Sequence, residues 1–99
     1  MLTRDRRITS QADFRHVMRR GARRVSPHLT VFALKTGAPS RFGFIVGKTV
    51  SKRAVVRNLV KRRLRALAAD APSGYDIVVL AAADAEFETL RAEFVKGVR

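Results

Sequence analysis

Hydrophobic residues follow two different periodicities along this chain. They are continuous or alternate in three stretches, which predicts β-strands at residues 29–34, 41–47 and 75–82. They recur every three or four positions in three other stretches, which predicts helices over about residues 10–20, about residues 52–69 and from near residue 84 onward. One additional short strand is expected around Val25 or Val50. The expected order is therefore α-β-β-(β)-α-β-α.

The first predicted helix has recognisable ends. Ser10 is a residue type that caps helix N-termini, and Asp13 suits the positive end of the helix. Gly21 follows the last helical position as a natural C-cap. The apolar stripe of this helix consists of Phe14, Val17 and Met18. The basic residues 1–8 before it are expected to be loosely held.

The second predicted helix combines an apolar stripe with many cations. The stripe consists of Val56, Val60, Leu64 and Leu67. A basic row of Arg57, Lys61 and Arg65 runs beside it, with Asn58 and Arg62 further round the helix. Like charges four positions apart weaken an isolated helix by a few tenths of a kcal/mol per pair. The arrangement therefore predicts a partner that supplies the opposite charge.

The strand candidates predict a layered domain. The two faces of residues 41–47 are Phe42, Phe44 and Val46 on one side and Gly43, Ile45 and Gly47 on the other. The short connection from residues 29–34 predicts an antiparallel hairpin between these two strands. Residues 75–82 are apolar on both faces, which predicts an interior position in the sheet. We expect one domain over residues 1–99, an α/β sandwich of the α+β class.

Positive charge is abundant and unevenly distributed. The chain has 99 residues, with 21 Lys and Arg against 8 Asp and Glu, and a formal net charge of +13. Residues 1–69 hold 18 of these cations and 2 of the acids. Residues 48–65 hold eight cations and no acid. A basic surface confined to one part of a folded chain is typical of nucleic-acid-binding proteins.

Composition disfavours several other classes. The chain has no run of about 18 apolar residues and no Trp, so a membrane is not an expected partner. The N-terminus lacks the apolar segment of a secretion signal, which favours a cytoplasmic location. The chain has no Cys, so disulfides and thiolate metal sites are excluded.

Groups that could catalyse a reaction are sparse. His16 lies among arginines and His28 follows Pro27, and neither has the spacing of a metal ligand or a catalytic base. Structural or phosphate-contacting roles are expected for both. The chain also lacks a phosphate-binding glycine loop. We therefore expect no catalytic residue, no metal site and no cofactor bound by the protein alone.

The aromatic residues near the basic half allow two interpretations. Phe14 with Met18, and one face of the predicted hairpin, are either ordinary core or the walls of a shallow groove. In the second case, unpaired bases would stack there. Sequence pattern alone leaves both open.

Several sequence blocks together resemble the protein subunit of bacterial ribonuclease P. Arg57-Asn58-Leu59, followed by Lys61-Arg62 and Arg65, is similar to the Arg-Asn-Arg signature of that family. The other blocks are Asp13-Phe14 with Arg19-Arg20-Gly21, Phe42-Gly43-Phe44-Ile45-Val46 with Lys48 and Lys52, and Gly74-Tyr75-Asp76-Ile77-Val78. The departure is Leu59, which stands where the family has its second arginine. Arg63, one turn further on, is a candidate to replace that charge.

The resemblance implies a fold and a role. The fold would be the ribosomal protein S5 domain 2-like sandwich, a mixed sheet with a left-handed crossover around the second helix. The role would be to assist the endonucleolytic removal of the 5′ leader from precursor tRNA. The RNA subunit would catalyse this reaction, with magnesium. The implied partners are ribonuclease P RNA and precursor tRNA.

The resemblance also implies which residues meet each partner. Those implied to face the catalytic RNA are Lys48, Lys52, Arg53, Arg57, Asn58, Lys61, Arg62 and Arg65. Those implied to border the cleft for the single-stranded leader are Phe14, Met18 and Phe32. Two other functions stay open: a general RNA-binding protein of the ribosome or an RNA chaperone, and a nuclease that acts without RNA.

Overall fold

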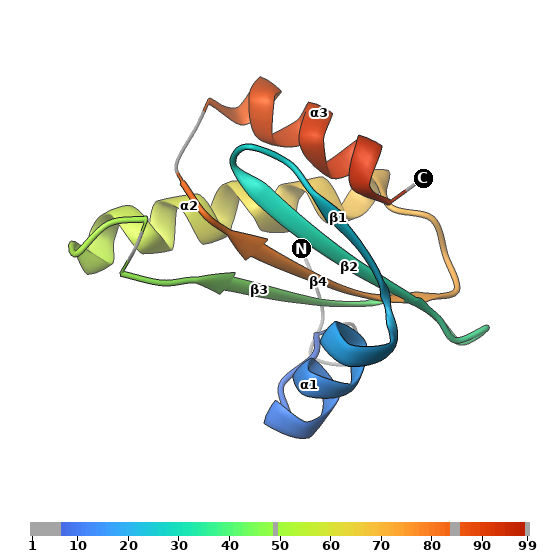
Figure 1. Ribbon diagram of the computed structural model, residues 1–99. Helices are drawn as coiled ribbons and strands as arrows, with labels where there is room; N and C mark the ends of the chain where they lie inside the picture. Colours follow the sequence, from blue (N-terminus) through green and yellow to red (C-terminus); the bar gives the residue numbers. More distant parts are fainter. Residues whose placement is uncertain (1–6, 49, 84–85, 99) are drawn as a thin grey trace.

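A four-stranded mixed sheet separates one helix from two others (Figure 1). The computed structural model describes residues 7–48, 50–83 and 86–98. The elements are α1 (Gln11–Arg20), β1 (Ala22–Val25), β2 (Leu29–Lys35), β3 (Arg41–Val46), α2 (Ala54–Ala66), the 3₁₀ helix η2 (Leu67–Asp70), β4 (Tyr75–Ala81) and α3 (Phe87–Gly97). This order matches the prediction, and β1 is the short strand expected near Val25. The expected start of the third helix near residue 84 lies outside the described residues, and α3 begins at Phe87.

The predicted hairpin between β2 and β3 is wrong. The strand order is β1-β2-β4-β3, so β4 lies between them, antiparallel to β2 and parallel to β3. The reason is that β4 is buried along most of its length, because its two faces pack against the apolar clusters under the helices on either side of the sheet. The β2–β3 connection crosses the start of β4, where the N–H groups of Thr36 and Gly37 donate to the Gly74 carbonyl at 2.8 and 3.2 Å. Gly37 and Gly74 both have positive φ there, which glycine adopts without strain.

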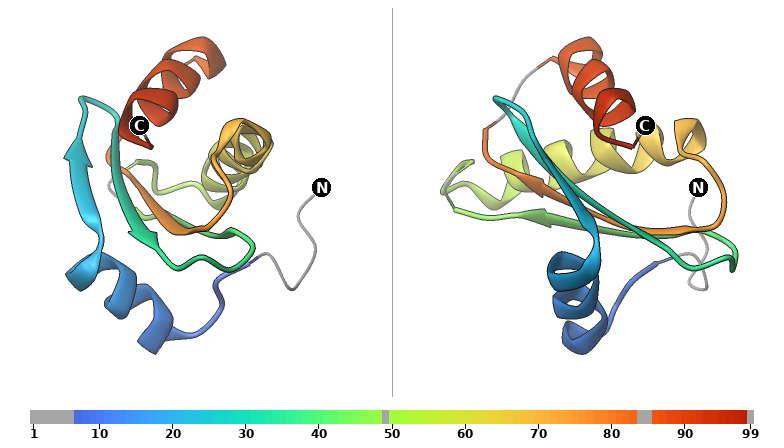
Figure 2. Two further views of the ribbon diagram at one scale, coloured as in Figure 1. Left: turned by 90° about the vertical axis from the view of Figure 1, so that its right-hand side faces the viewer. Right: turned by 45° about the vertical axis from the view of Figure 1, so that its right-hand side comes forward.

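The two faces of the sheet bury separate apolar clusters. α2 and α3 cover one face, and α1 covers the other (Figure 2). The larger cluster packs under α2 and α3 and includes Leu29, Val31, Phe42, Val60, Leu64, Leu67, Ile77, Val79, Leu90 and Phe94. The smaller cluster under α1 has Ile8, Val17, Phe32 and Val78 as its buried members. Phe42 and Gly43 therefore face opposite sides, as the period-two pattern predicts.

The segment before α1 is held more firmly than expected. Ile8 is buried, and its N–H donates to the Phe42 carbonyl at 2.8 Å. Arg7 pairs with Phe42 in a parallel bridge, so this segment lies along the outer edge of β3. The sequence prediction of a loose segment was wrong for residues 7 and 8, because Ile8 completes the apolar cluster under α1. The rest of that segment lies outside the described residues.

The predicted ends of α1 are largely confirmed. The Ser10 side chain accepts a hydrogen bond from the Ala12 N–H at 3.1 Å, as an N-cap does. Gly21 follows the helix in an extended rather than left-handed conformation, and its N–H donates to the Val17 carbonyl. A side chain at Gly21 would collide with that carbonyl oxygen. Glycine is therefore needed for close approach rather than for a left-handed φ.

Candidate nucleic-acid interface

The cationic helix α2 is fixed by its apolar stripe. Val60, Leu64 and, in the following turn, Leu67 are fully buried, and Val56 is half-buried. Val60, Leu64 and Leu67 pack on the sheet face that carries Phe42, whereas Val56, predicted as part of the same stripe, lies outside that cluster. Because the stripe occupies one side of the helix, the basic residues are directed to its flanks and outer face. The prediction that this helix has one packing face and one charged face is confirmed.

The approach to α2 is exposed and basic. Lys48, Lys52 and Arg53 are all exposed, and the first turn of α2 contains no acidic residue. The N-terminal end of a helix carries a partial positive charge of its own. Phosphate groups would thus be attracted here both by the side chains and by the backbone.

The Arg57 side chain forms hydrogen bonds with the backbone of the protein itself. One guanidinium nitrogen donates to the carbonyls of Ser51 and Lys52, at 3.0 and 2.9 Å. The half-buried side chain therefore ties the preceding loop to the first turn of α2. Sequence periodicity places Arg57 in the same row as Lys61 and Arg65 but gives no sign of this tether.

The outer face of α2 holds a shallow depression with apolar and polar lining. It has a volume of about 370 Å³ and is lined by Val55, Val56, Asn58, Leu59 and Arg62. Leu59 is 41% exposed, and Asn58 and Arg62 beside it are exposed. Leu59 thus stands on the outward surface, where an arginine would also reach solvent. Arg63 is half-buried and takes part in an interaction within the protein.

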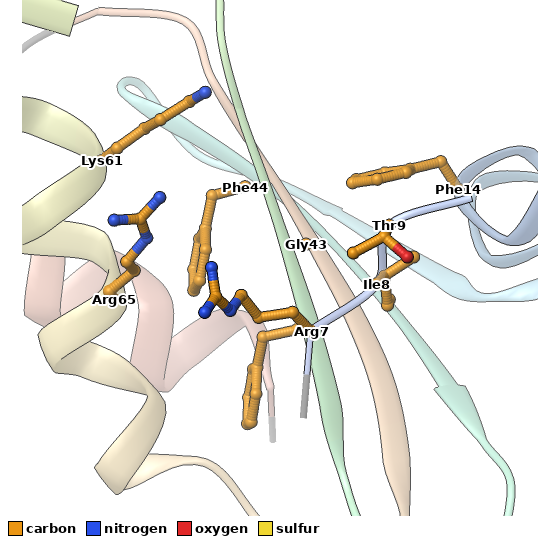
Figure 3. A pocket seen from close by; sticks show the side chains of 9 residues that line it. Arg7, Ile8, Thr9, Phe14, Gly43, Phe44, Lys61 and Arg65 are labelled. Carbon is orange, nitrogen blue, oxygen red and sulfur yellow. The ribbon is translucent and has the colours of Figure 1, made fainter. Parts of the chain in front are cut away.

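The inner flank of α2 forms a basic groove with the edge of β3. The groove has a volume of about 110 Å³ and is lined by Arg7, Ile8, Thr9, Phe14, Phe42, Gly43, Phe44, Lys61 and Arg65. Figure 3 shows the guanidinium groups of Arg65 from α2 and Arg7 from the N-terminal segment on either side of the Phe44 ring, while the Lys61 side chain extends from α2 past the ring toward the sheet. We call this the β3-edge groove. The family resemblance implies RNA contact for Lys61 and Arg65, and Phe44 is on the predicted hairpin, for one face of which a groove was left open. Arg7 was not predicted.

Phe14, Met18 and Phe32 come together on the other face of the sheet. All three belong to the cluster under α1, where Phe14 and Met18 are half-buried and Phe32 is only 7% exposed. The Phe14 ring packs directly on the backbone of Gly43, where a Cβ atom would collide with it. Phe14 also lines one end of the β3-edge groove. The structure therefore groups the three residues, with Phe14 and Met18 as the more accessible pair.

Arg41 fixes the sheet and α1 relative to one another. Its guanidinium donates to both carboxylate oxygens of Asp76, at 3.1 and 2.7 Å, and to Asp13 of α1 at 3.5 Å. The hydrogen bonds to Asp76 raise the pKa of Arg41 further above its ordinary value, and burial only partly opposes them. Arg41 is thus a structural cation and is distinct from the residues predicted to face RNA.

His28 is paired with Glu93 of α3. The Nδ1 atom of His28 lies 2.6 Å from one Glu93 oxygen, and the N–H groups of His28 and Leu29 donate to the other at 2.8 and 3.0 Å. Burial raises the pKa of Glu93, but these three hydrogen bonds outweigh it, so the pKa lies below its ordinary value. This geometry gives His28 the structural role that was one of its two expected roles. His16 is exposed on α1 beside Arg15, Arg19 and Arg20.

In the described part of the chain, no three His, Asp or Glu side chains gather in a way that could hold a metal ion. Within the same residues, no helix is both long enough and apolar enough to cross a membrane.

Comparison with known proteins points to one family. The family model described as Ribonuclease P matches residues 2–99. The ribonuclease P protein component of Clavibacter michiganensis is 42% identical, over 99% of this chain and 94% of that protein. The component from Kocuria rhizophila is also 42% identical, over 99% of this chain and 93% of its own length.

Solved structures agree with the sequence relatives. The RNase P protein of Staphylococcus aureus has a TM-score of 0.79 at 25% identity, covering 94% of this chain and 91% of that one. The RNase P protein of Thermotoga maritima has a TM-score of 0.77 at 24% identity, covering 93% and 94%. These likenesses confirm the expected α+β class with its mixed sheet, in which α2 forms the crossover between the parallel strands β3 and β4.

Proposed function

This chain belongs to the ribonuclease P protein family, and from that premise we propose which of its surfaces binds each RNA partner. The family's role is the processing of the 5′ leader of tRNA, and this chain is the protein component of that machinery. In our proposal the chain carries no catalytic residue. The RNA subunit performs the hydrolysis with its own magnesium ions. The protein binds both ribonuclease P RNA and precursor tRNA and so positions one relative to the other.

The basic flanks and the outer face of α2, with the segment leading to it, form the contact with ribonuclease P RNA. The observation that carries this proposal is the position of the basic residues on a helix whose opposite side is locked into the core by Val60 and Leu64. Cations fixed on a rigid helix can neutralise several phosphates of a folded RNA and set the orientation of the protein on it. The residues proposed for this contact are Lys48, Lys52, Arg53, Arg57, Asn58, Lys61, Arg62 and Arg65.

The cluster under α1 forms the contact with the leader of precursor tRNA. Phe14 and Met18 present half-buried apolar surface, and Phe32 supports them from β2. Unpaired bases gain about 1–3 kcal/mol each by stacking on aromatic rings, whatever their sequence. Such a surface suits a leader whose sequence varies from one tRNA to another. This processing would take place in the cytoplasm.

Reconstitution tests the proposal. The protein is added to bacterial ribonuclease P RNA at low magnesium concentration, and cleavage of precursor tRNA is followed. Stimulation that requires the RNA supports the proposal, because the protein then acts through the RNA. Cleavage by the protein alone would instead indicate a nuclease that acts without RNA. RNA binding without stimulation would indicate a general RNA-binding or chaperone protein.

A further inference from the structure

Three cations from two distant parts of the chain line the β3-edge groove. Lys61 and Arg65 reach it from α2, and Arg7 reaches it from the segment before α1 (Figure 3). None of the described residues that line the groove is acidic. Cations held close together repel one another, and this repulsion is relieved when an anion binds among them. The groove therefore has the electrostatics of a phosphate site.

The position of Arg7 is set by backbone pairing. The parallel bridge between Arg7 and Phe42 and the bond from the Ile8 N–H to the Phe42 carbonyl hold the segment on the edge of β3. The exposed Arg7 side chain is thus directed across the groove rather than along a free tail. Guanidinium groups can hold two phosphate oxygens at once, which favours a phosphodiester over a simple halide ion.

Phe44 supplies an aromatic surface between these cations. Its ring lies parallel to that of Phe42, with 6.4 Å between the centroids and 3° between the planes. Phe42 is buried, so it supports the Phe44 ring from the core side, while Phe44 itself is only half-buried. A fixed, partly exposed ring among phosphate-binding cations is the combination that single-stranded nucleic-acid sites use.

The groove also connects the two surfaces described above. Phe14 of the cluster under α1 lines it together with Lys61 and Arg65 of α2. A single-stranded RNA segment that leaves the Phe14 surface can therefore cross the edge of β3 and reach α2 without passing over the rest of the sheet. No other strand pairs with this edge along the described residues, apart from the bridge at Arg7.

We propose that the β3-edge groove binds one nucleotide of a single-stranded RNA segment, with its phosphate among Arg7, Lys61 and Arg65 and its base or ribose against Phe44. This inference rests on the proposed function, and in it the segment is the leader, which continues from Phe14 and meets the catalytic RNA at Lys61 and Arg65. A segment of the catalytic RNA has the same chemistry, and the experiment below separates the two sources.

The first measurement uses the free protein and a short single-stranded RNA of mixed sequence. Arg7→Gln removes one phosphate contact, so the slope of log affinity against log salt should become shallower by about 0.7. Phe44→Leu keeps the apolar packing but removes the ring. It should weaken binding by about tenfold and leave the salt slope unchanged. Lys96→Gln on α3 is the matched control, because it removes the same charge from an exposed site away from the groove.

The second measurement uses the complex with ribonuclease P RNA. If the groove takes the leader, both variants weaken binding of precursor tRNA but not of mature tRNA. If the groove binds the catalytic RNA, both variants weaken the binding of the protein to ribonuclease P RNA. Binding of precursor tRNA and of mature tRNA to the complex is then affected equally. Either result supports an RNA subsite in the groove and identifies its source.

The proposal is overturned if Arg7→Gln keeps the wild-type salt slope and Phe44→Leu keeps the wild-type affinity in every arm. Thermal melts establish that the variants are folded. Should Phe44→Leu fail to fold, Arg7→Gln decides alone, since its side chain is exposed and its backbone pairing is retained. Failure of the proposed function is a separate outcome: the wild-type protein would then not stimulate cleavage, whereas the groove is judged by binding.

Discussion

Arg41 and Asp76 form a two-bonded ion pair at the point where the parallel strands β3 and β4 begin. The guanidinium Nε and Nη2 atoms donate to the two carboxylate oxygens, at 3.1 and 2.7 Å. The two residues are also direct partners in the strand register. The pair therefore fixes the register of β3, on which both the Phe44 and the Gly43 faces of the site depend.

Asp76→Asn should lower the free energy of unfolding by about 2 kcal/mol, because it removes a charged acceptor from a side chain that is only 8% exposed. Asp13→Asn is the matched control, since Asp13 meets the same arginine at 3.5 Å but is 45% exposed. Screening by solvent should keep the cost of that change within about 0.5 kcal/mol. Urea unfolding of the two variants measures both costs. Equal costs would show that the buried Asp76 contact stabilises the protein no more than the exposed Asp13 contact does.

The contact between His28 and Glu93 predicts a pH dependence of stability. The pKa of Glu93 is lower in the folded chain than its ordinary value of 4.5. The stabilisation from its ionised form is therefore complete above about pH 4.5 and is lost as the pH falls through the folded value. Urea unfolding of the wild type and of Glu93→Gln should show a difference in free energy that is constant near neutral pH. The difference should narrow on acidification below about pH 4.5. A difference in the free energy of unfolding that does not change with pH would contradict the lowered pKa of Glu93.

The strand pairing illustrates what periodicity can and cannot predict. The period-two pattern correctly separated Phe42 from Gly43, because side-chain alternation is a local property of any strand. The hairpin between β2 and β3 was predicted from the short loop between them, but pairing is a choice among all strands. The apolar character of β4 on both faces already indicated an interior strand. Applied to the strand order, it would have placed β4 between the other two.

The site shows the same division between local and long-range information. Helical spacing predicted the charged face of α2 with Lys61, Arg62 and Arg65, and the family resemblance implied that this face meets the catalytic RNA. Arg7 was not, because its position depends on a backbone bridge to Phe42, which lies 35 residues further along the chain. The signal available in the sequence was Ile8 itself, because an apolar residue in a basic segment indicates docking against the core. The structure shows Ile8 buried there.

Gly43→Ala should disturb the proposed leader surface without touching any charge. The added methyl group would collide with the Phe14 ring, so either the ring moves or α1 shifts. We expect a loss of about 1–3 kcal/mol in the free energy of unfolding. In complexes with ribonuclease P RNA, affinity should fall for precursor tRNA but not for mature tRNA.

Phe14→Leu provides the control for that prediction. A smaller side chain leaves room for the methyl group, so Gly43→Ala should cost less stability in the Phe14→Leu background than in the wild type. Full additivity of the two changes would show that the glycine and the ring do not interact. Equal loss of affinity for precursor and mature tRNA would contradict the placement of the leader at Phe14.

Leu59 is the position at which this chain departs from the Arg-Asn-Arg signature that it otherwise resembles. Leu59 is on the exposed outer face of α2, between Val55 and Arg62. Leu59→Arg should therefore add a phosphate contact without removing a buried side chain. We expect tighter binding to ribonuclease P RNA and a salt slope steeper by about 0.7–0.9, the increments for one additional phosphate on single strands and on B-DNA. Titration of the RNA subunit at several salt concentrations measures both.

The same background tests whether Arg63 supplies the charge that Leu59 lacks. If it does, Arg63→Ala should weaken RNA binding in the wild type and cost clearly less once Leu59→Arg is present, because the two guanidinium groups would serve one phosphate. Arg63 is half-buried and already engaged within the protein, so a thermal melt of Arg63→Ala must accompany the titration. Unchanged affinity in Arg63→Ala would rule out compensation. An equal loss in both backgrounds would mean that Arg63 binds RNA independently of position 59.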